Sequence, residues 1–219
     1  MLNLDKIDRI ASLSLENAFR LHEDSILLYG RRRYPAAFFL SVLAQEEVGK
    51  MHIATDFTWH SRIEGRMTSD MEERWLKGLY QHPRKQGSFL RNSPLNYYRP
   101  KALKLMEEIF DGTLERKKQE SVYVGLKRER GTIDVKGKIR HPFQITSRRA
   151  QSQITKVNDY LLVMGLGIVN EFYSLDGTPV EDLFTKRMLR AFATKWKPRS
   201  RDAAARICSM HEQSGEAII

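Results

Sequence analysis

The sequence has a single cysteine and no long apolar run. One cysteine, Cys208, excludes an intramolecular disulfide and a zinc site built from cysteines, and it fits a reducing compartment. Residues 1–9 alternate apolar with charged side chains and lack the apolar core of a signal peptide. The most apolar stretch, residues 160–169, has about half the length that a bilayer span needs. We therefore expect a cytoplasmic protein with no membrane contact.

Recognisable cofactor motifs are missing as well. The six histidines include no HExxH pair and no convincing histidine–carboxylate pairing, so we expect no metal. Gly165 and Gly167 lie inside an apolar helical pattern, where small residues allow helices to pack closely, and they do not form a phosphate loop. The sequence therefore predicts a protein without a cofactor.

Positive charge is present in excess but unevenly placed. The 219 residues include 37 Lys and Arg against 27 Asp and Glu, a net charge of +10. Residues 115–149 hold 11 basic and 4 acidic residues, and residues 186–206 hold 8 basic and 1 acidic, so each segment carries +7 and the remainder −4. Such clusters are typical of a nucleic-acid-binding surface, and equally of a solvated loop and a helix end.

Apolar residues recur at spacings of three and four over most of the chain, which predicts helices. The predicted helices span 5–29, 34–59, 69–90 with a break at Pro83, 100–110, 145–173 and 179–196, and a turn at Asp111 and Gly112 ends the fourth of them. With no extended strands beside them, they indicate an all-α fold, an antiparallel bundle of four or five amphipathic helices. We expect one domain over residues 1–197, followed by a basic tail over 198–219 that is partly helical or frayed.

Residues 113–144 interrupt this helical pattern. They are basic, contain glycine, and include two β-like runs at 122–124 and 132–135. This composition predicts an irregular insertion with a small hairpin.

Three short elements share an order and spacing with a known family. Residues 34–50 read YPAAFFLSVLAQEEVGK, residues 82–86 read HPRKQ, and Lys118-Gln119 precedes the apolar run 122–124. Over about residues 4–172 these elements resemble the AbiV-type abortive infection proteins, a branch of the HEPN superfamily of helical domains.

The resemblance implies a HEPN-like bundle, often dimeric, that acts in bacterial defence against phage. Many HEPN proteins are metal-independent ribonucleases that use an Arg-polar-x(3–4)-His motif. Only Arg206 and His211 have this spacing here, and Ile207 replaces the polar residue. The sequence departs from the motif at this point.

The candidate catalytic residues are His82, Lys85, Glu46 and Lys50. RNA cleavage by the 2′-OH needs a base, an acid and positive charge at the phosphorane, and histidine can serve the first two roles. Lys85 and Lys50 could supply the charge, and Glu46 could orient Lys50 or His82. The structural alternative is that Glu46 and Lys50, four residues apart on an apolar stripe with Phe39, form a buried ion pair. His82 would then be a capping or core residue.

Several nearby polar residues are candidates for contacts with RNA. They are Glu47, Gln86, Lys117, Lys118, Gln119, Tyr123 and Arg140. Tyr123 is equally expected as a core aromatic. Two main functions stay open: a phage-defence effector that cleaves RNA without a metal, and a non-enzymatic module that binds RNA, the ribosome or a phage protein. An antitoxin-like or nucleotide-transfer module is a third. We expect a homodimer, with a phage-encoded protein as activator.

Overall fold

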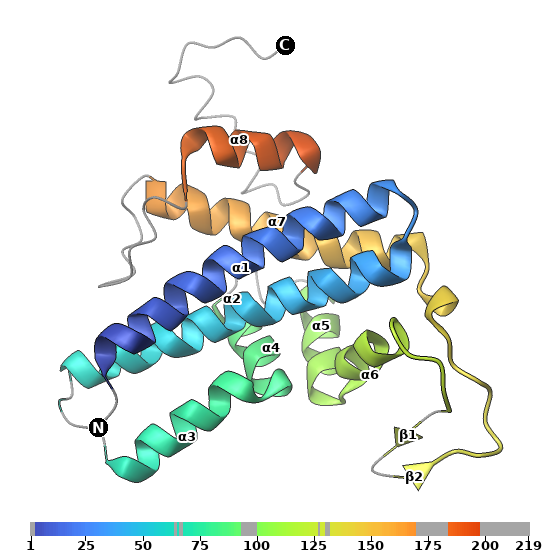
Figure 1. The fold of residues 1–219 in the computed structure, drawn as a ribbon, viewed down its shortest axis with the longest axis horizontal. Helices are drawn as coiled ribbons and strands as arrows, with labels where there is room; N and C mark the ends of the chain where they lie inside the picture. The colour runs from blue at the N-terminus through green and yellow to red at the C-terminus, as the bar shows by residue number, and fades with distance from the viewer. Residues whose placement is uncertain are drawn as a thin grey trace.

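A computed structural model describes residues 3–63, 65, 68–92, 100–126, 128–129, 132–169 and 184–197. Within these ranges the chain has eight α-helices, one short 3₁₀ helix and one two-stranded hairpin (Figure 1). The predicted all-α class is confirmed. The helical patch expected near 202–210, the Arg206 and His211 pair and most of the basic tail lie outside the described residues.

The first two helices form a long antiparallel hairpin, α1 (Leu4–Gly30) and α2 (Tyr34–Ile63). The side chain of Asn3 caps α1 by accepting a hydrogen bond of 2.9 Å from the backbone N–H of Asp5. Arg32 adopts a φ of 59° in the tight connection. Helix α2 then packs against α1, α4 and α7, so it is central to the bundle.

The buried face of α2 differs from the predicted stripe. The predicted apolar stripe of this helix consists of Phe39, Leu43, Ile53 and Phe57, and the last two are buried as expected. Phe39 and Leu43 are half-buried, whereas their neighbours Phe38 and Val42 are fully buried. A single stripe applies to a helix with one buried side. Because α2 has neighbours on three sides, its buried residues extend around most of its circumference.

The next four helices are short and follow one another closely. They are α3 (Ser69–Tyr80), α4 (His82–Arg91), α5 (Pro100–Phe110) and α6 (Thr113–Glu120). The expected break near Pro83 is confirmed, since Gln81 separates α3 from α4 and Pro83 occupies the first turn. Helix α6 corrects the prediction of an irregular insertion from residue 113. It starts after Gly112, whose φ of 73° suits glycine, and the Asp111 carboxylate accepts a 2.8 Å bond from the N–H of Thr113.

The described residues of the range 122–143, which we call the arm, project away from the bundle (Figure 1). Strands β1 (Arg128–Glu129) and β2 (Thr132–Ile133) pair antiparallel, and a bridge between Gly125 and Arg140 closes the base. The expected small hairpin is confirmed, but the run 122–124 is not a strand. It lies outside the sheet because the ladder forms nearer the tip. The 3₁₀ helix η1 (Pro142–Gln144) leads back to the bundle.

Helix α7 (Ser147–Val169) crosses the α1–α2 pair, and α8 (Lys186–Lys195) lies over it (Figure 1). The helix predicted over 145–173 was expected to turn Ile154, Val157, Tyr160 or Leu161, Met164, Ile168 and Phe172 inward. All of these are buried except Phe172, which lies outside the described residues. Gly165 permits the close approach of Phe184 and Leu189, as its packing role predicted. Helix α8 begins at Lys186, where the side chain of Thr185 caps it by accepting a 3.1 Å bond from the N–H of Met188; the expected start at residue 179 lies outside the described residues.

Two apolar clusters fill the bundle. One joins α1, α2, α7 and α8, and the other joins the start of α2 to α4, α5 and α6. Val48 belongs to the first cluster and Val42 to the second, and Glu46 lies between them on α2. None of the helices in the described ranges is long and apolar enough to span a membrane.

Candidate functional site

A buried carboxylate lies where α2, α4 and α6 meet. Glu46 is 1% exposed. Its Oε2 lies 2.6 Å from Nδ1 of His82 and 3.5 Å from Nζ of Lys85. Its Oε1 accepts bonds of 2.8 Å from Gln86 Nε2 and 2.8 Å from Lys118 Nζ. Glu115 pairs with Lys118 and completes the group. We call these six residues the cage: Glu46, His82, Lys85, Gln86, Glu115 and Lys118.

Helical spacing and one glycine bring α4 to this carboxylate. His82, Lys85 and Gln86 follow the i, i+3, i+4 pattern and so share the face of α4 that meets α2. Gly49 of α2, less than one turn beyond Glu46, faces the backbone of Lys85 in α4. A Cβ at Gly49 would fall on the carbonyl oxygen of Lys85 and lie 2.6 Å from its carbonyl carbon. The missing side chain therefore allows the backbones of the two helices to touch.

Helix α6 supplies the other half of the cage. Glu115 and Lys118 are one turn apart, and their Oε2 and Nζ atoms are separated by 2.7 Å. Lys118 is 2% exposed, so its ammonium depends on protein partners rather than on water. Glu46 and Glu115 supply one carboxylate each, and Lys85 and Lys118 one ammonium each. The formal charges in the cage thus cancel while His82 is neutral.

The electrostatic balance keeps Glu46 ionised. Burial by itself raises the pKa of this carboxyl group. The hydrogen bond and charge of Lys118, together with the hydrogen bonds from Gln86 and His82, outweigh burial, and the net pKa is lowered. A buried carboxylate with this set of donors is a fixed negative charge at neutral pH.

This charge determines which nitrogen of His82 carries the proton. Nδ1 faces the ionised Glu46 at 2.6 Å, and this contact assigns the proton of the neutral ring to Nδ1. The ammonium of Lys118, which lies 3.1 Å from the same nitrogen, then donates to the carboxylates of Glu46 and Glu115 and not to the ring. Nε2 has no hydrogen-bond partner among the described residues, and the side chain is 45% exposed. The imidazole therefore presents a proton acceptor toward solvent and is held from behind by a carboxylate.

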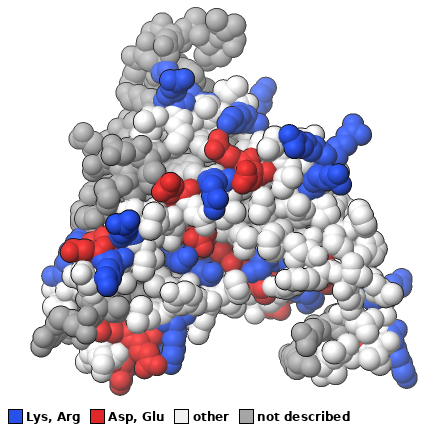
Figure 2. Space-filling view, in the orientation of Figure 1, with Lys and Arg blue, Asp and Glu red and all other residues white. Residues whose placement is uncertain are grey.

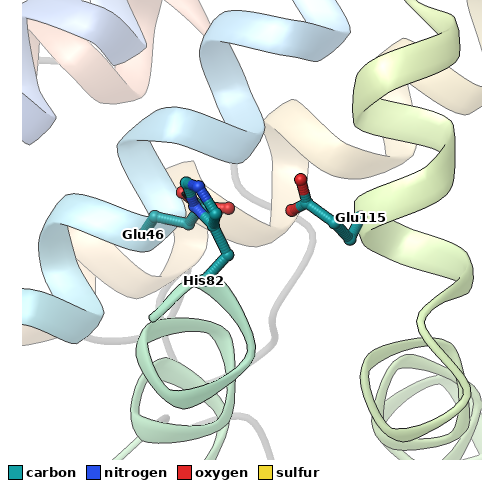
Figure 3. Close-up of side chains that lie close together, drawn as sticks. All are labelled: Glu46, His82 and Glu115. Carbon is teal, nitrogen blue, oxygen red and sulfur yellow. Dashed lines mark hydrogen bonds and ion pairs between the residues drawn. The ribbon is translucent and has the colours of Figure 1, made fainter. Parts of the chain in front are cut away.

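The cage also contains a set of potential metal ligands. Figure 3 shows Glu46 from α2, His82 from the start of α4 and Glu115 from α6 turned toward one another, with ligand atoms within 4.8 Å. Nζ of Lys118 lies 2.8 Å from the first, 3.1 Å from the second and 2.7 Å from the third. Its ammonium thus occupies the position between the three groups, and a metal ion could bind there only by displacing it.

Lys50 is not part of the cage, contrary to the expected pair with Glu46. Its Nζ lies 3.2 Å from the carboxylate of Glu47, and both side chains are partly exposed. Glu46 instead pairs with Lys118, which comes from another helix. The buried-pair alternative was correct about the burial of Glu46 and wrong about its partner.

The remaining RNA-binding candidates on α6 and the arm lie outside the cage. Lys117 pairs with Glu108 at 3.3 Å, and Gln119 bonds Glu115 at the rim of the cage at 2.9 Å. Tyr123 is 65% exposed on the arm, so its core alternative is wrong. Arg140 lies 3.8 Å from Glu120 at the base of the arm.

Sequence reasoning missed Glu115 and Gly49. The signal for Glu115 was its spacing of three from Lys118, which went unused because residues 113–120 were not expected to be helical. Gly49 was part of the quoted 34–50 element, but only the docking of α4 gives its missing side chain a role.

The described parts of the two basic segments, within 115–149 and 186–197, lie on different sides of the bundle (Figure 1), and residues 198–206 lie outside the described residues. Helix α8 lies beyond α1 and α7, whereas α6 and the arm lie on the opposite side of α2 (Figure 1). On the face in Figure 2, basic and acidic side chains are interspersed. Within residues 115–149 several cations are already paired, among them Lys118 and Arg149, whose guanidinium lies 2.6 Å from Glu108. Burial raises the pKa of Glu108, but Arg149 and neighbouring lysines lower it to about 2 overall.

An all-α bundle with these features belongs to the class of HEPN-like helical domains. The family model HEPN_AbiV, described as AbiV, matches residues 6–162 and thus includes every residue of the cage. The chain belongs to this family, whose function is abortive infection, a defence of bacteria against phage. No curated protein and no solved structure matches the chain significantly.

Proposed function

We propose that this phage-defence protein cleaves RNA without a metal ion and that the cage is its active site. The observation that carries the proposal is the geometry of His82, whose Nδ1 lies 2.6 Å from a buried carboxylate while Nε2 is free of protein partners in the described residues. A histidine oriented in this way can accept a proton from a substrate and return it.

In the proposed reaction, Nε2 of His82 takes the proton of the ribose 2′-OH. The 2′ oxygen attacks the adjacent phosphorus, and the bond to the 5′ oxygen of the next nucleotide breaks. That oxygen leaves with a proton returned by the imidazolium, so the products are a 2′,3′-cyclic phosphate and a free 5′-OH. Glu46 stabilises the imidazolium in between.

The lysines of the cage divide into two roles in this proposal. Lys85 lies one turn from His82 and retains about a tenth of its side-chain exposure, so it is the cation placed to stabilise the phosphorane. Lys118 is fully enclosed and holds Glu46 in place, so we assign it a positioning role rather than phosphate binding.

Cleavage of total RNA in the presence of EDTA tests this proposal. We expect the wild-type protein, with lysate of phage-infected cells as a source of activator, to produce fragments that end in cyclic phosphate. His82→Asn should leave RNA intact, whereas Lys50→Ala, which lies outside the cage, should retain cleavage. If wild type and His82→Asn leave RNA equally intact in the activated reaction, the nuclease proposal fails.

A separate observation supports a homodimer. The arm carries apolar side chains that are mostly exposed, including Val135 at 74%, Ile139 at 62% and Phe143 at 87%. Exposed apolar groups at this density are typical of protein contacts. We propose that the arm contacts a second copy of the chain. Light scattering should then give the molar mass of a monomer for the variant Ile139→Glu/Phe143→Glu. A dimer that persists in this variant would contradict the contact and would favour a phage-encoded protein as the partner of the arm.

A further inference from the structure

Helix α4 has a second functional face, turned away from the cage. Arg84, Ser88 and Arg91 follow the i, i+4, i+7 spacing on this face. With Arg74 and Trp75 of α3, among other residues, they line an open groove of about 470 Å³ between the two helices. None of the described residues that line this groove is acidic.

The arginines are held in place but keep free donors. Nη1 of Arg84 donates a 2.9 Å bond to the carbonyl oxygen of Arg74, and the absent side chain of Gly78 leaves it room. Nη2 of Arg91 lies 2.8 Å from Asp56, yet the Arg91 side chain is 67% exposed. A guanidinium has five N–H groups, so each of these contacts leaves most donors available. Ordering by the protein reduces the entropy lost when a ligand binds.

The groove combines this charge with one aromatic surface. Trp75 is half-buried and its ring meets Phe57 edge-on at a centroid distance of 5.8 Å, so the indole is fixed while part of it lines the groove. Arginines beside a partly exposed aromatic ring match the chemistry of a single nucleic-acid strand, with phosphates on the guanidinium groups and a base against the ring.

We infer that the groove between α3 and α4 binds single-stranded RNA and leads it to His82, an inference that rests on the proposed function. His82 is the first residue of α4. At the helical rise of about 1.5 Å per residue, Arg84 to Arg91 span roughly 10 Å of the same helix. A strand lying along these arginines reaches the end of α4 where the free Nε2 of His82 faces solvent.

Fluorescence anisotropy with a labelled single-stranded RNA tests the groove, using His82→Asn as background so that the probe stays intact. Arg74→Gln/Arg84→Gln should weaken binding about tenfold and flatten the slope of log K against log salt by about 1.4, at about 0.7 per phosphate contact. The matched control, Arg20→Gln/Arg187→Gln, removes two exposed arginines elsewhere and should change neither value.

The outcomes separate this inference from the nuclease proposal. The groove would be overturned as an RNA site if the control pair weakened RNA binding as much as the groove variant does. The same conclusion would follow if the protein bound poly-glutamate as tightly as it binds RNA. Groove-dependent binding without any cleavage by wild type would retain the groove and reject the nuclease. Cleavage that survives unchanged in the groove variant, in the active background, would reject the groove and retain the cage.

Discussion

Gly49→Ala tests the contact on which the cage depends. The new Cβ would lie 2.6 Å from the carbonyl carbon of Lys85, and an ordinary contact begins at 3.4 Å, so α4 must move by at least 0.8 Å. Both sides of the clash are backbone, and no side chain can rotate away. Overpacking costs about 1–3 kcal/mol, and we take the upper end, less about 1 kcal/mol gained from the helix propensity of alanine. The expected net loss is about 2 kcal/mol.

Thermal unfolding measures this loss. For a domain of this size about 2 kcal/mol lowers Tm by roughly 4–8 °C. The control is Gly87→Ala on α4, where a Cβ meets nothing within 4 Å, so the alanine should raise stability by up to about 1 kcal/mol. The movement of α4 also carries His82 away from Glu46, and cleavage should fall about 100-fold. A Gly49→Ala protein as stable as Gly87→Ala would refute the close packing of α2 and α4.

Three further predictions concern charge. Glu46→Gln leaves the enclosed ammonium of Lys118 with Glu115 alone, and urea unfolding should show a loss of about 3–5 kcal/mol; an unchanged midpoint would contradict the buried pairing. Lys118→Ala empties the position between the three potential ligands, so calorimetry should detect Zn²⁺ binding by the variant and not by wild type, and equal binding by both would disprove it. Burial lowers the pKa of His22 from 6.5 to about 4. Since the unfolded chain takes up the proton first as the pH falls, the contribution of His22 to the free energy of unfolding is complete above pH 6.5 and falls by about 3 kcal/mol by pH 4. His22→Gln should reduce this pH dependence of the unfolding free energy, and an identical slope would count against it.

The helices were predictable because periodicity acts locally. The spacing of apolar residues located α1, α2, α4 and α7 within a few residues. The turn formed by Asp111 and Gly112 was recognised as the end of α5, but not as the start of α6. The eight residues of α6 are strongly polar, and α6 is held by contacts to α2 and α5 that no local pattern displays.

The sequence predicted most of the residues of the cage but not which of them pair with one another. Glu46, His82, Lys85 and Gln86 were singled out as a polar group, and the structure brings them together. Lys50 was expected as the ion-pair partner because it is four residues from Glu46. The actual partner, Lys118, is 72 residues away. Spacing on one helix shows which side chains share a face, and it carries no information about which other helix docks against that face.

The sequence by itself determined the helical class, the family and the presence of charged residues on apolar faces, because these depend on residue type and short-range spacing. Only the tertiary structure decided that Lys118 neutralises Glu46, that Nδ1 of His82 faces this carboxylate, and that the described parts of the two basic segments lie apart. Each of these depends on distances between helices, since electrostatic and hydrogen-bond energies fall steeply over a few ångströms.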